Sequence, residues 1–382
     1  MREKVCIGDL GTIITGKTPS KTNKSYYGNY VAFIKPTDIS EDSKFTYETE
    51  EMYSKLAAEK YKSSLIPKGA ICIPCIGTIG TKMTMTHCAC YTNQSINTII
   101  CNENYDNEYV YYLMKNFLPN LKSYNLGTAS GREFISKSNF EKIEIVVEQN
   151  KNIQKEIGKF LSRYDSLIEN YQKQIKLLEE SAQRLYKEWF IDLRFPGHEN
   201  VQIVDGVPEG WEKKNLGDIT PIKTGKRDAN FGTADGEYPF FTCAQEPIKS
   251  PAYSFDTSAV ILAGNGDFNV KLYRGKFEAY QRTYVLEPND TNMLYLLFFC
   301  VLENMNRLAT GASGSTIKFL TKGMIESLDL YEPAVDTLCA FNMIVEPIQR
   351  QKESLSTQIR HLAEARDRLL PKLMSGEINV NR

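Results

Sequence analysis

The sequence predicts a duplicated fold of the α/β (α+β) class, in which two compact heads are each followed by one long helix. Three observations support this expectation. An apolar seam with heptad spacing occupies residues 150–190, a second seam follows it 184 residues later, and short motifs of the two head segments recur in the same order. Such a repeat indicates that each half of the chain has the same fold. We therefore expect the two halves to be related by a pseudo-two-fold axis.

The first seam predicts a long helix. Its apolar residues are separated by alternating steps of four and three, the spacing that keeps one face of a helix apolar. A helix of about 40 residues is roughly 60 Å long at 1.5 Å per residue, and it can bury this face only against a partner. The seam residues are Ile157, Leu161, Tyr164, Ile168, Tyr171, Ile175, Leu178, Ala182, Leu185 and Trp189.

The second seam predicts that partner. Eight of its ten positions are again apolar: Phe341, Val345, Ile348, Lys352, Leu355, Ile359, Leu362, Arg366, Leu369 and Leu373. We expect the two helices to form an antiparallel coiled coil, the arrangement that a pseudo-two-fold repeat favours. Lys352 and Arg366 interrupt the seam. We interpret them as apolar stems with charged ends that reach solvent, and a contact with another subunit is the alternative.

The heads repeat as well. Thr15-Gly16-Lys17 recurs as Thr224-Gly225-Lys226, Ala129-Ser130-Gly131 recurs as Ala312-Ser313-Gly314, and Asn93-Gln94 lies in a strand-like context much as Tyr280-Gln281 does. Short runs rich in β-branched residues alternate with helical patterns in each head. The expected strands are 70–76, 95–101, 259–263 and 283–286, and the expected helices are 108–117 and 293–303.

These patterns divide the chain into four parts. We expect a first head over residues 1–147, a first spacer helix over 148–192, a second head over 193–333 and a second spacer helix over 334–382. The turn Phe195-Pro196-Gly197 and the stretch Pro208–Trp211 mark the joint between the halves.

Composition narrows the functional class. The 382 residues are 42% hydrophobic and 24% charged, which is typical of a globular chain of two or more domains. No signal peptide or membrane-spanning window is apparent, and the nine cysteines fit free thiols in the cytoplasm. The formal net charge of −1 means that any basic surface for nucleic acid has to be local.

A phosphate-binding loop is one alternative. Gly11-Thr-Ile-Ile-Thr-Gly16-Lys17-Thr18 has the spacing of such a loop, which would make the protein a P-loop nucleotide hydrolase. That site requires a helix directly after the lysine. Here Pro19 follows at once and opens a loop-like stretch, so the spacing alone gives little support to nucleotide binding.

A zinc-stabilised interaction scaffold is a second alternative. Cys72 and Cys75 together with Cys88 and Cys90 could supply four thiolates, with His87 beside them. The simpler interpretation is that Cys72 and Cys75 are small apolar residues of a buried strand. The sequence leaves open whether these four cysteines bind metal.

Catalysis by this chain is not indicated. None of the three histidines, His87, His198 and His361, lies in a convincing nucleophile pattern. The Asn-Pro-Pro-aromatic tetrapeptide that amino-methyltransferases use is absent from the sequence. We therefore expect a binding protein that lacks catalytic, cofactor and metal residues of its own.

Local charge points to DNA. Residues 17–35 contain four lysines and no acid, interleaved with tyrosines, and residues 268–282 contain four basic residues against one acid. Basic loops with hydroxyls, amides and aromatic rings suit phosphate contacts and base reading. A solvated loop would look similar. The recurrence of the feature in both heads favours two heads that read two half-sites at a fixed separation.

On these residues the chain resembles the specificity subunit of type I restriction-modification enzymes. The resemblance covers essentially the whole sequence. It rests on the head opening Leu10-Gly11 with Thr15–Ser20, the head closing Ser313–Thr316 through Leu320-Thr321, and the helix ending Leu178-Glu179 with Leu185–Phe190. Each motif is weak alone, but their order, found twice with two long heptad helices, is specific.

The resemblance implies a role and a set of partners. Each head would be a target recognition domain that reads one part of a split, asymmetric sequence in double-stranded DNA. The helices would act as a ruler and would bind two methyltransferase subunits, which restriction subunits can join. S-adenosylmethionine, ATP and Mg²⁺ would belong to those partners, and no cofactor would bind this chain.

The candidate DNA-contacting residues combine this resemblance with local charge. The first head lacks the Ser-Thr pair that closes the second, so the contact there is in doubt, and Lys226-Arg227 replaces Lys17-Thr18, so we expect the heads to read different bases. The candidates are Lys17, Thr18, Lys21, Lys24, Tyr26, Lys35, Lys82, Ser130, Arg132, Lys226, Arg227, Lys271, Arg274, Arg282, Ser313, Ser315, Thr316 and Lys318.

Overall fold

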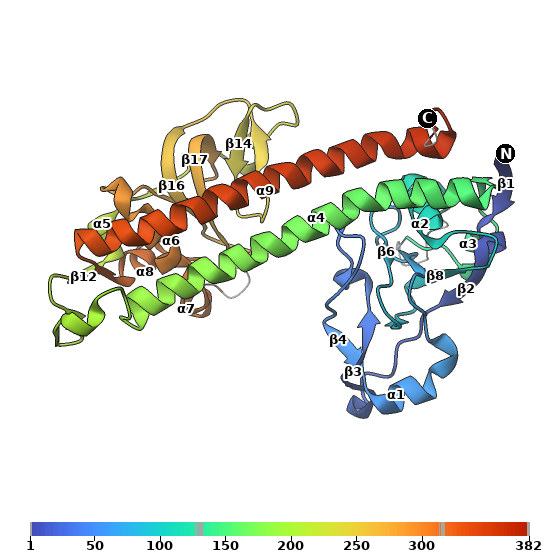
Figure 1. Cartoon of the computed structure of the whole chain (residues 1–382), viewed down its shortest axis with the longest axis horizontal. Helices are drawn as coiled ribbons and strands as arrows, with labels where there is room; N and C mark the ends of the chain where they lie inside the picture. The colour runs from blue at the N-terminus through green and yellow to red at the C-terminus, as the bar shows by residue number, and fades with distance from the viewer. Residues whose placement is uncertain (1, 126, 128–132, 313, 315–317, 380–382) are drawn as a thin grey trace. The chain divides into compact units, whose positions relative to one another are not determined.

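The protein contains two compact units that interleave along the sequence. The computed structural model describes residues 2–125, 127, 133–312, 314 and 318–379. Unit 1 comprises Met1–Lys173 and Leu355–Arg382, and unit 2 comprises Gln174–Ser354. Each unit therefore holds one head together with a part of each long helix. Figure 1 draws the two helices, α4 (Lys151–Tyr186) in green and α9 (Val335–Ser375) in red.

The head of unit 1 is built from three small sheets. Strands β1 (Arg2–Cys6) and β9 (Glu144–Glu148) pair antiparallel at its base. A four-stranded sheet has the order β2-β8-β5-β6, and a three-stranded sheet has the order β4-β3-β7. These strands are β2 (Gly11–Thr15), β3 (Tyr27–Ile34), β4 (Glu51–Tyr53), β5 (Ile71–Pro74), β6 (Thr84–Met85), β7 (Tyr91–Thr92) and β8 (Ile96–Cys101).

Helices complete this head. Helix α2 (Asn107–Phe117) is the main one, and Asp106 caps it by accepting a hydrogen bond from the Tyr109 amide. Six consecutive residues, 109–114, are buried, because one face of α2 packs on the sheet and the other on the long helices. The shorter helices are α1 (Lys55–Lys60) and α3 (Lys137–Glu141).

The head of unit 2 repeats this plan. Strands β12 (Glu212–Asn215) and β19 (Asp329–Glu332) form the antiparallel base pair. One six-stranded sheet, in the order β13-β18-β16-β17-β14-β15, takes the place of the two larger sheets of the first head. Its strands are β13 (Ile222–Thr224), β14 (Tyr238–Phe241), β15 (Ile248–Ser250), β16 (Phe255–Ala263), β17 (Val270–Ala279) and β18 (Thr283–Leu286).

Strand pairing confirms the duplication. β2 pairs with β8 and β8 with β5 in the first head, as β13 pairs with β18 and β18 with β16 in the second. The parallel pairing of β3 with β7 likewise has its counterpart in that of β14 with β17. The heads differ most in the hairpin β16–β17, whose strands are much longer than β5 and β6.

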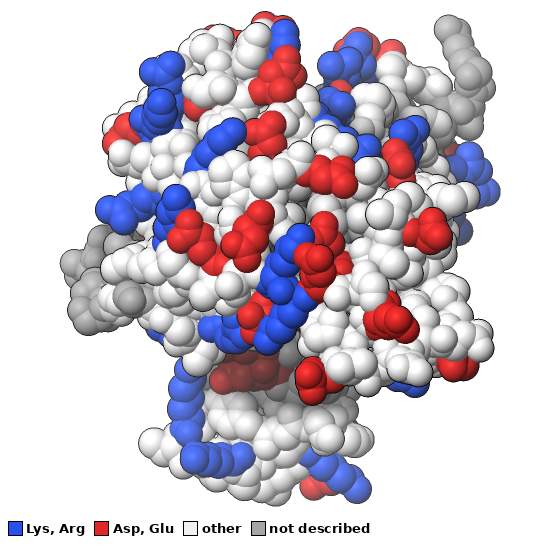
Figure 2. Space-filling view, turned by 90° about the vertical axis from the view of Figure 1, so that its left-hand side faces the viewer, with Lys and Arg blue, Asp and Glu red and all other residues white. Residues whose placement is uncertain are grey.

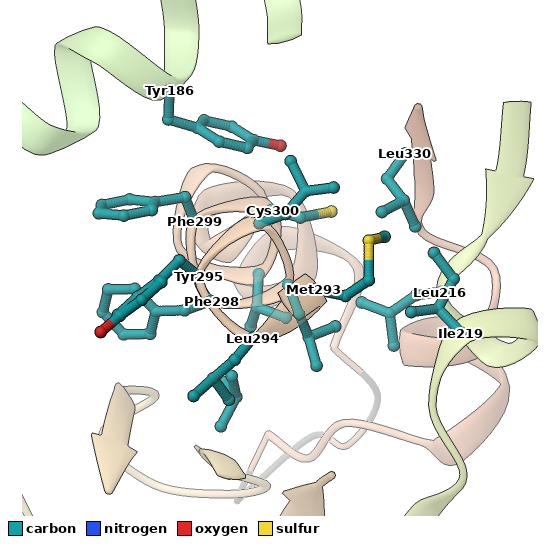
Figure 3. Close-up of a cluster of buried hydrophobic side chains, with 14 of the residues drawn as sticks. Tyr186, Leu216, Ile219, Met293, Leu294, Tyr295, Phe298, Phe299, Cys300 and Leu330 are labelled. Atoms are coloured by element: carbon teal, nitrogen blue, oxygen red, sulfur yellow. The ribbon is translucent and has the colours of Figure 1, made fainter. Parts of the chain in front are cut away.

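A buried aromatic and aliphatic cluster joins the head of unit 2 to its helices. Figure 3 shows Tyr186 of α4 pointing toward Phe299 and Cys300 of α6 (Leu294–Glu303), and the two rings stack with centroids 5.7 Å apart. Eight residues of α6, 294–301, are buried, which a helix enclosed on all sides requires. The remaining elements here are the hairpin β10 (Ile203–Val204) and β11 (Val207–Pro208), and helices α5 (Leu216–Ile219), α7 (Met305–Gly311) and α8 (Lys322–Glu326).

The long helices run antiparallel within each unit. In unit 1, Ile157 and Leu161 of α4 share a buried cluster with Leu370 and Leu373 of α9. In unit 2, Glu179 of α4 forms an ion pair of 2.7 Å with Lys352, and Tyr186 lies against Phe341 with ring centroids 6.5 Å apart. The residue number of the α9 partner decreases as the residue number along α4 increases. The antiparallel arrangement expected from the two seams is therefore confirmed.

The two polar seam residues behave differently. The Lys352 side chain is 17% exposed, and its charged end pairs with Glu179, whose side chain is 54% exposed. Arg366 is only 6% exposed and pairs with Asp165 of α4, which is 5% exposed. The interpretation of Arg366 as a stem that reaches solvent was wrong, because a carboxylate on the facing helix compensates its charge inside the seam.

Candidate nucleic-acid interface

One glycine in each head follows the first strand of the larger sheet, Gly16 after β2 and Gly225 after β13. The Gly16 amide donates a hydrogen bond of 3.2 Å to the Ile96 carbonyl, and the Gly225 amide donates one of 3.1 Å to the Thr283 carbonyl. A Cβ atom on Gly16 would lie 2.1 Å from the carbonyl oxygen of Thr92, and one on Gly225 would lie 2.0 Å from a carbonyl oxygen. Only glycine permits this close backbone approach, which explains why Thr-Gly-Lys recurs in both heads.

A second segment lies beside this glycine and forms the same turn in both heads. The Ile96 amide donates to the Asn93 carbonyl at 3.2 Å, and the Thr283 amide donates to the Tyr280 carbonyl at 2.8 Å. We call the two segments together the recognition edge. It comprises residues 16–18 and 93–95 in head 1, and residues 225–227 and 280–282 in head 2.

A third segment is joined to this edge through the residue that comes directly after β5 in head 1 and after β16 in head 2. In head 1 the Cys75 amide donates to the Ser95 carbonyl at 2.7 Å, and the Ile135 amide donates to the Cys75 carbonyl at 2.9 Å. Head 2 repeats both bonds, from Gly264 to Arg282 at 2.9 Å and from Leu320 to Gly264 at 2.8 Å. Different sequences therefore build one backbone frame, and the frame brings the head-closing segment next to the recognition edge.

Several exposed polar side chains project from the recognition edge of head 1. Lys17, Thr18 and Gln94 are exposed, and the Thr18 hydroxyl donates a hydrogen bond to the Gln94 amide oxygen. The backbone of Lys17 is held on both sides, because its amide donates to Thr92 and its carbonyl accepts from the Tyr53 hydroxyl at 2.5 Å. The structure thus places the predicted residues Lys17 and Thr18 together.

The recognition edge of head 2 carries more positive charge. Lys226, Arg227 and Arg282 are exposed there, as predicted candidates, together with Gln281. The Arg227 guanidinium lies 4.3 Å from the centre of the Phe231 ring and 3.5 Å from the buried carboxylate of Glu278. Stacking and this ion pair hold Arg227 in place, while Arg282 and Gln281 border an open hollow of about 500 Å³.

The lysine-rich stretch of head 1 divides into exposed and paired residues. Lys21 and Lys24 are exposed on the segment between β2 and β3, where phosphate contacts are possible. Tyr26 is half-buried, and its ring packs edge-on against Tyr61 with centroids 6.1 Å apart. Lys35 forms ion pairs with Glu50 at 2.5 Å and Glu51 at 3.3 Å, so two carboxylates already neutralise it. Lys82 is half-buried in the segment between β5 and β6.

The second basic stretch is not the loop that we expected. Residues 270–279 form strand β17, in which neighbouring side chains point to opposite faces of the sheet. Lys271 donates to the Ala244 carbonyl at 3.0 Å, and burial lowers the pKa of its amine. Arg274 contacts the Tyr295 hydroxyl and lies 3.8 Å from Glu346 of α9. Both residues have partners inside unit 2, so their contact with DNA stays a prediction with less support.

Five candidate residues, Ser130, Arg132, Ser313, Ser315 and Thr316, lie outside the described residues. The ends of the first of these segments are tied together, because the side chain of Asn125 accepts hydrogen bonds of 2.9 Å from the amides of Gly127 and Phe134. Lys318 is exposed next to Phe319, which bridges to Asn265. Of these segments, the described residues Ile135 in head 1 and Leu320 in head 2 are bonded to the backbone frame of the recognition edge.

Surface charge agrees with a local rather than a general basic footprint. Figure 2 shows Lys and Arg interspersed with Asp and Glu on the face that it draws. The candidate interface is consequently defined by the recognition edges and not by overall charge. Among the described residues, no helix has the length and apolar character needed to cross a bilayer.

The two alternative sites lack the geometry that they require. The amides of residues 11–15 belong to β2, which pairs with β8 from Gly11 opposite Cys101 to Thr15 opposite Asn97, so they do not form a phosphate cradle. No group of three or more metal-binding side chains occurs in the part of the chain that the structure describes. Cys72 and Cys75 face different apolar clusters, and burial raises the pKa of each thiol to about 12.

Two residues of the recognition edge were not predicted from the sequence. Gln94 and Gln281 were noted as part of a repeat but were not candidates for DNA contact. The signal in the sequence was the recurrence of one glutamine, after Asn93 in head 1 and after Tyr280 in head 2, in an otherwise different context. Only the hydrogen-bond frame shows that the two glutamines occupy the same place.

Comparisons with known proteins give one consistent result. The family model described as the type I restriction modification DNA specificity domain matches residues 2–180 and 208–353. The MjaIX specificity subunit of Methanocaldococcus jannaschii is 28% identical over 98% of this chain and 93% of its own length. The EcoDI specificity subunit of Escherichia coli is 40% identical over 45% of this chain and 39% of its own.

A solved structure supports the fold. The S subunit of a type I restriction-modification system from M. genitalium matches with a TM-score of 0.62 and 18% identity, covering 98% of this chain and 96% of that one. At this identity the match concerns the fold alone. The fold predicted from the internal repeat therefore agrees with that of a known protein over nearly the whole chain.

Proposed function

Since the chain belongs to the type I restriction modification DNA specificity family, we propose that it is the subunit that selects the DNA sequence on which such a complex acts. Each head would read one part of a split, asymmetric target in double-stranded DNA. The observation that carries this proposal is the recognition edge, which two heads of different sequence build with the same backbone hydrogen bonds. Two such edges suit two half-sites, and their different side chains suit different half-site sequences.

The polar side chains divide into two kinds of contact. Lys17 and Lys226 follow the two glycines and are exposed, and they would bind phosphate and so set the position of each head on the duplex. Thr18, Arg227 and Arg282 can contact base edges, and an arginine is the usual partner of guanine in the major groove. Lys21 and Lys24 would add phosphate contacts in head 1.

Catalysis would belong to partner subunits. We propose that two methyltransferase subunits bind the long helices, that restriction subunits can join them, and that S-adenosylmethionine, ATP and Mg²⁺ are bound by those partners. Apolar side chains that are exposed on the helices, such as Leu177 at 62% and Met343 at 78%, would be available for these contacts.

The test is reconstitution. The chain would be mixed with its methyltransferase subunits, S-adenosylmethionine and genomic DNA, and methylated positions would be sequenced. We expect methylation of one bipartite motif, and none with the chain alone or with the methyltransferase subunits alone. Methyl transfer by the isolated chain, or methylation by the mixture without any motif, would contradict the proposal.

A further inference from the structure

Gln94 and Gln281 occupy the same position in the two heads. Each is exposed, and each lies one residue after the carbonyl that closes the turn of the recognition edge. The residues on either side differ, Asn93 and Ser95 in one head and Tyr280 and Arg282 in the other. The two heads therefore share the glutamine, although the residues beside it differ.

The shared glutamine is not explained by the turn itself. The turn is closed by backbone groups, and in head 1 the side chain of Asn93 also accepts a hydrogen bond of 3.0 Å from the Ser95 amide. The contact beside the glutamine also differs, because the Thr18 hydroxyl donates to the side chain of Gln94, whereas the backbone amide of Gln281 donates to the Arg227 carbonyl at 2.9 Å. A structural role common to both heads would need a common partner, so a common external ligand is the better explanation.

The chemistry of the side chain suits one base. A glutamine amide offers one acceptor and one donor group side by side. In the major groove adenine presents a donor at N6 next to an acceptor at N7, whereas guanine presents two acceptors and cytosine one donor. A glutamine that reaches the groove can make both hydrogen bonds with adenine only. The neighbouring Lys17 and Lys226 supply the phosphate contacts that would hold it in register.

The backbone frame also fixes the position of the main chain from which each glutamine side chain extends. Backbone hydrogen bonds of 2.7–3.2 Å hold the residues before and after Gln94. Backbone hydrogen bonds of 2.8–3.0 Å hold the residues before and after Gln281. In head 1 the Thr18 hydroxyl contacts the amide of Gln94, and in head 2 Gln281 borders the open hollow with Arg282 and Tyr284. A rigid base lowers the entropy lost when the side chain binds.

We propose that Gln94 and Gln281 are specificity-determining residues, each of which reads one adenine in the half-site of its own head. This inference rests on the proposed function and assigns the same base contact to both heads. The remaining differences between the edges, such as Thr18 against Arg227, would then supply the differences between the two half-sites.

The test uses the full chain assembled with its methyltransferase subunits. Gln94→Ala and Gln281→Ala would be compared with the exposed Gln202→Ala, which lies outside both edges. Each edge variant should lose discrimination at a single adenine by roughly 5- to 150-fold, the loss expected for one bidentate contact. The two variants should relax different half-sites, and Gln202→Ala should relax neither.

A conservative variant separates reading from folding. Gln94→Glu keeps the size of the side chain but removes its donor, so it should lose the same adenine preference while the melting temperature of the chain stays unchanged. An unchanged motif in both alanine variants, or an equal loss of binding to every sequence, would overturn the assignment. A wild-type complex that methylates no bipartite motif would instead refute the proposed function, so the two failures are distinguishable.

Discussion

Asp165 of α4 and Arg366 of α9 form an ion pair that is almost fully buried in unit 1. Their side chains are 5% and 6% exposed, and the Tyr112 hydroxyl of α2 donates to the same carboxylate. Arg366 also reaches Asp367 at 2.8 Å. Residues from the head and from both long helices therefore meet in one polar cluster, which links the orientation of head 1 to the register of the helices.

Removing one member of this pair should destabilise unit 1. Arg366→Leu would leave Asp165 buried without a cation, and we expect a loss of about 3–5 kcal/mol in the free energy of unfolding. The double variant Asp165→Leu with Arg366→Leu should recover most of that loss, because no buried charge remains. Urea denaturation with hydrogen exchange of the α2 amides would measure both.

The matched control for this variant is on the same helix. Arg360→Ala removes an exposed pair with Glu364, which should cost about 0.5 kcal/mol or less. If Arg366→Leu were no more destabilising than Arg360→Ala, the buried pair would contribute little, and the link between head and helices would have to be sought elsewhere.

Gly225→Ala should disrupt the recognition edge of head 2. Its Cβ would lie 2.0 Å from a backbone oxygen, so the edge has to shift, and DNA binding by this head should fall at least about tenfold. Gly323→Ala in α8 is the control, because no atom lies within 4 Å of its Cβ and alanine favours a helix. Fluorescence anisotropy with a target duplex would test this, and equal affinities of the two variants would contradict it.

Lys21→Ala and Lys24→Ala should each weaken binding to all DNA sequences. If each lysine neutralises one phosphate, the slope of log K against log salt should decrease by about 0.9 per variant. Lys35→Ala is the control, since Glu50 and Glu51 already pair with Lys35 and its loss should leave the slope unchanged. Binding titrations between 50 and 200 mM salt, as commonly used for such slopes, would decide the matter.

The buried thiols should resist alkylation. Burial raises the pKa of Cys72 and Cys75 to about 12, so both stay protonated at pH 8, whereas Cys88 and Cys339 are exposed. Iodoacetamide followed by mass spectrometry should label the exposed pair and spare the buried pair. The same shift makes the folded state less stable as the pH rises above about 9, where thiols of the unfolded chain ionise.

Zinc binding by these cysteines would give a different labelling pattern. A bound metal would require thiolates, so one equivalent of zinc that protects Cys88 from labelling would contradict the buried-strand interpretation. We expect the labelling pattern to be the same with zinc and with a chelator.

Lengthening both helices should change the gap between the half-sites. Seven residues inserted between Lys173 and Gln174, and seven between Ser354 and Leu355, fall at the unit boundaries and keep the heptad register. Each helix becomes about 10 Å longer, which corresponds to roughly three base pairs. Methylome sequencing should show the same half-sites with a longer gap. An unchanged gap at full activity would mean that the helices do not set the spacing.

The sequence alone determined the duplication, the two long helices and the class of protein. Periodicity is a local property, so the heptad steps from Ile157 to Trp189 and from Phe341 to Leu373 could be read without coordinates. Thr-Gly-Lys could also be read as a repeat of both heads, although the carbonyl oxygens that exclude a side chain at Gly16 and Gly225 belong to segments distant in sequence. The same local information misled us where charge was considered without its neighbours. It indicated a basic loop at residues 268–282, where the chain forms β17, and a solvent-exposed end for Arg366.

Only the tertiary structure decided which basic side chains pair with a carboxylate inside the protein. Lys35, Arg274 and Arg366 look like Lys21 and Arg282 in the sequence, but their carboxylate partners come from positions 15 to 201 residues away along the chain. Gln94 and Gln281 became a matched pair for a related reason. Their equivalence rests on backbone hydrogen bonds between segments that are distant in sequence, and such pairing leaves no periodic trace in either segment.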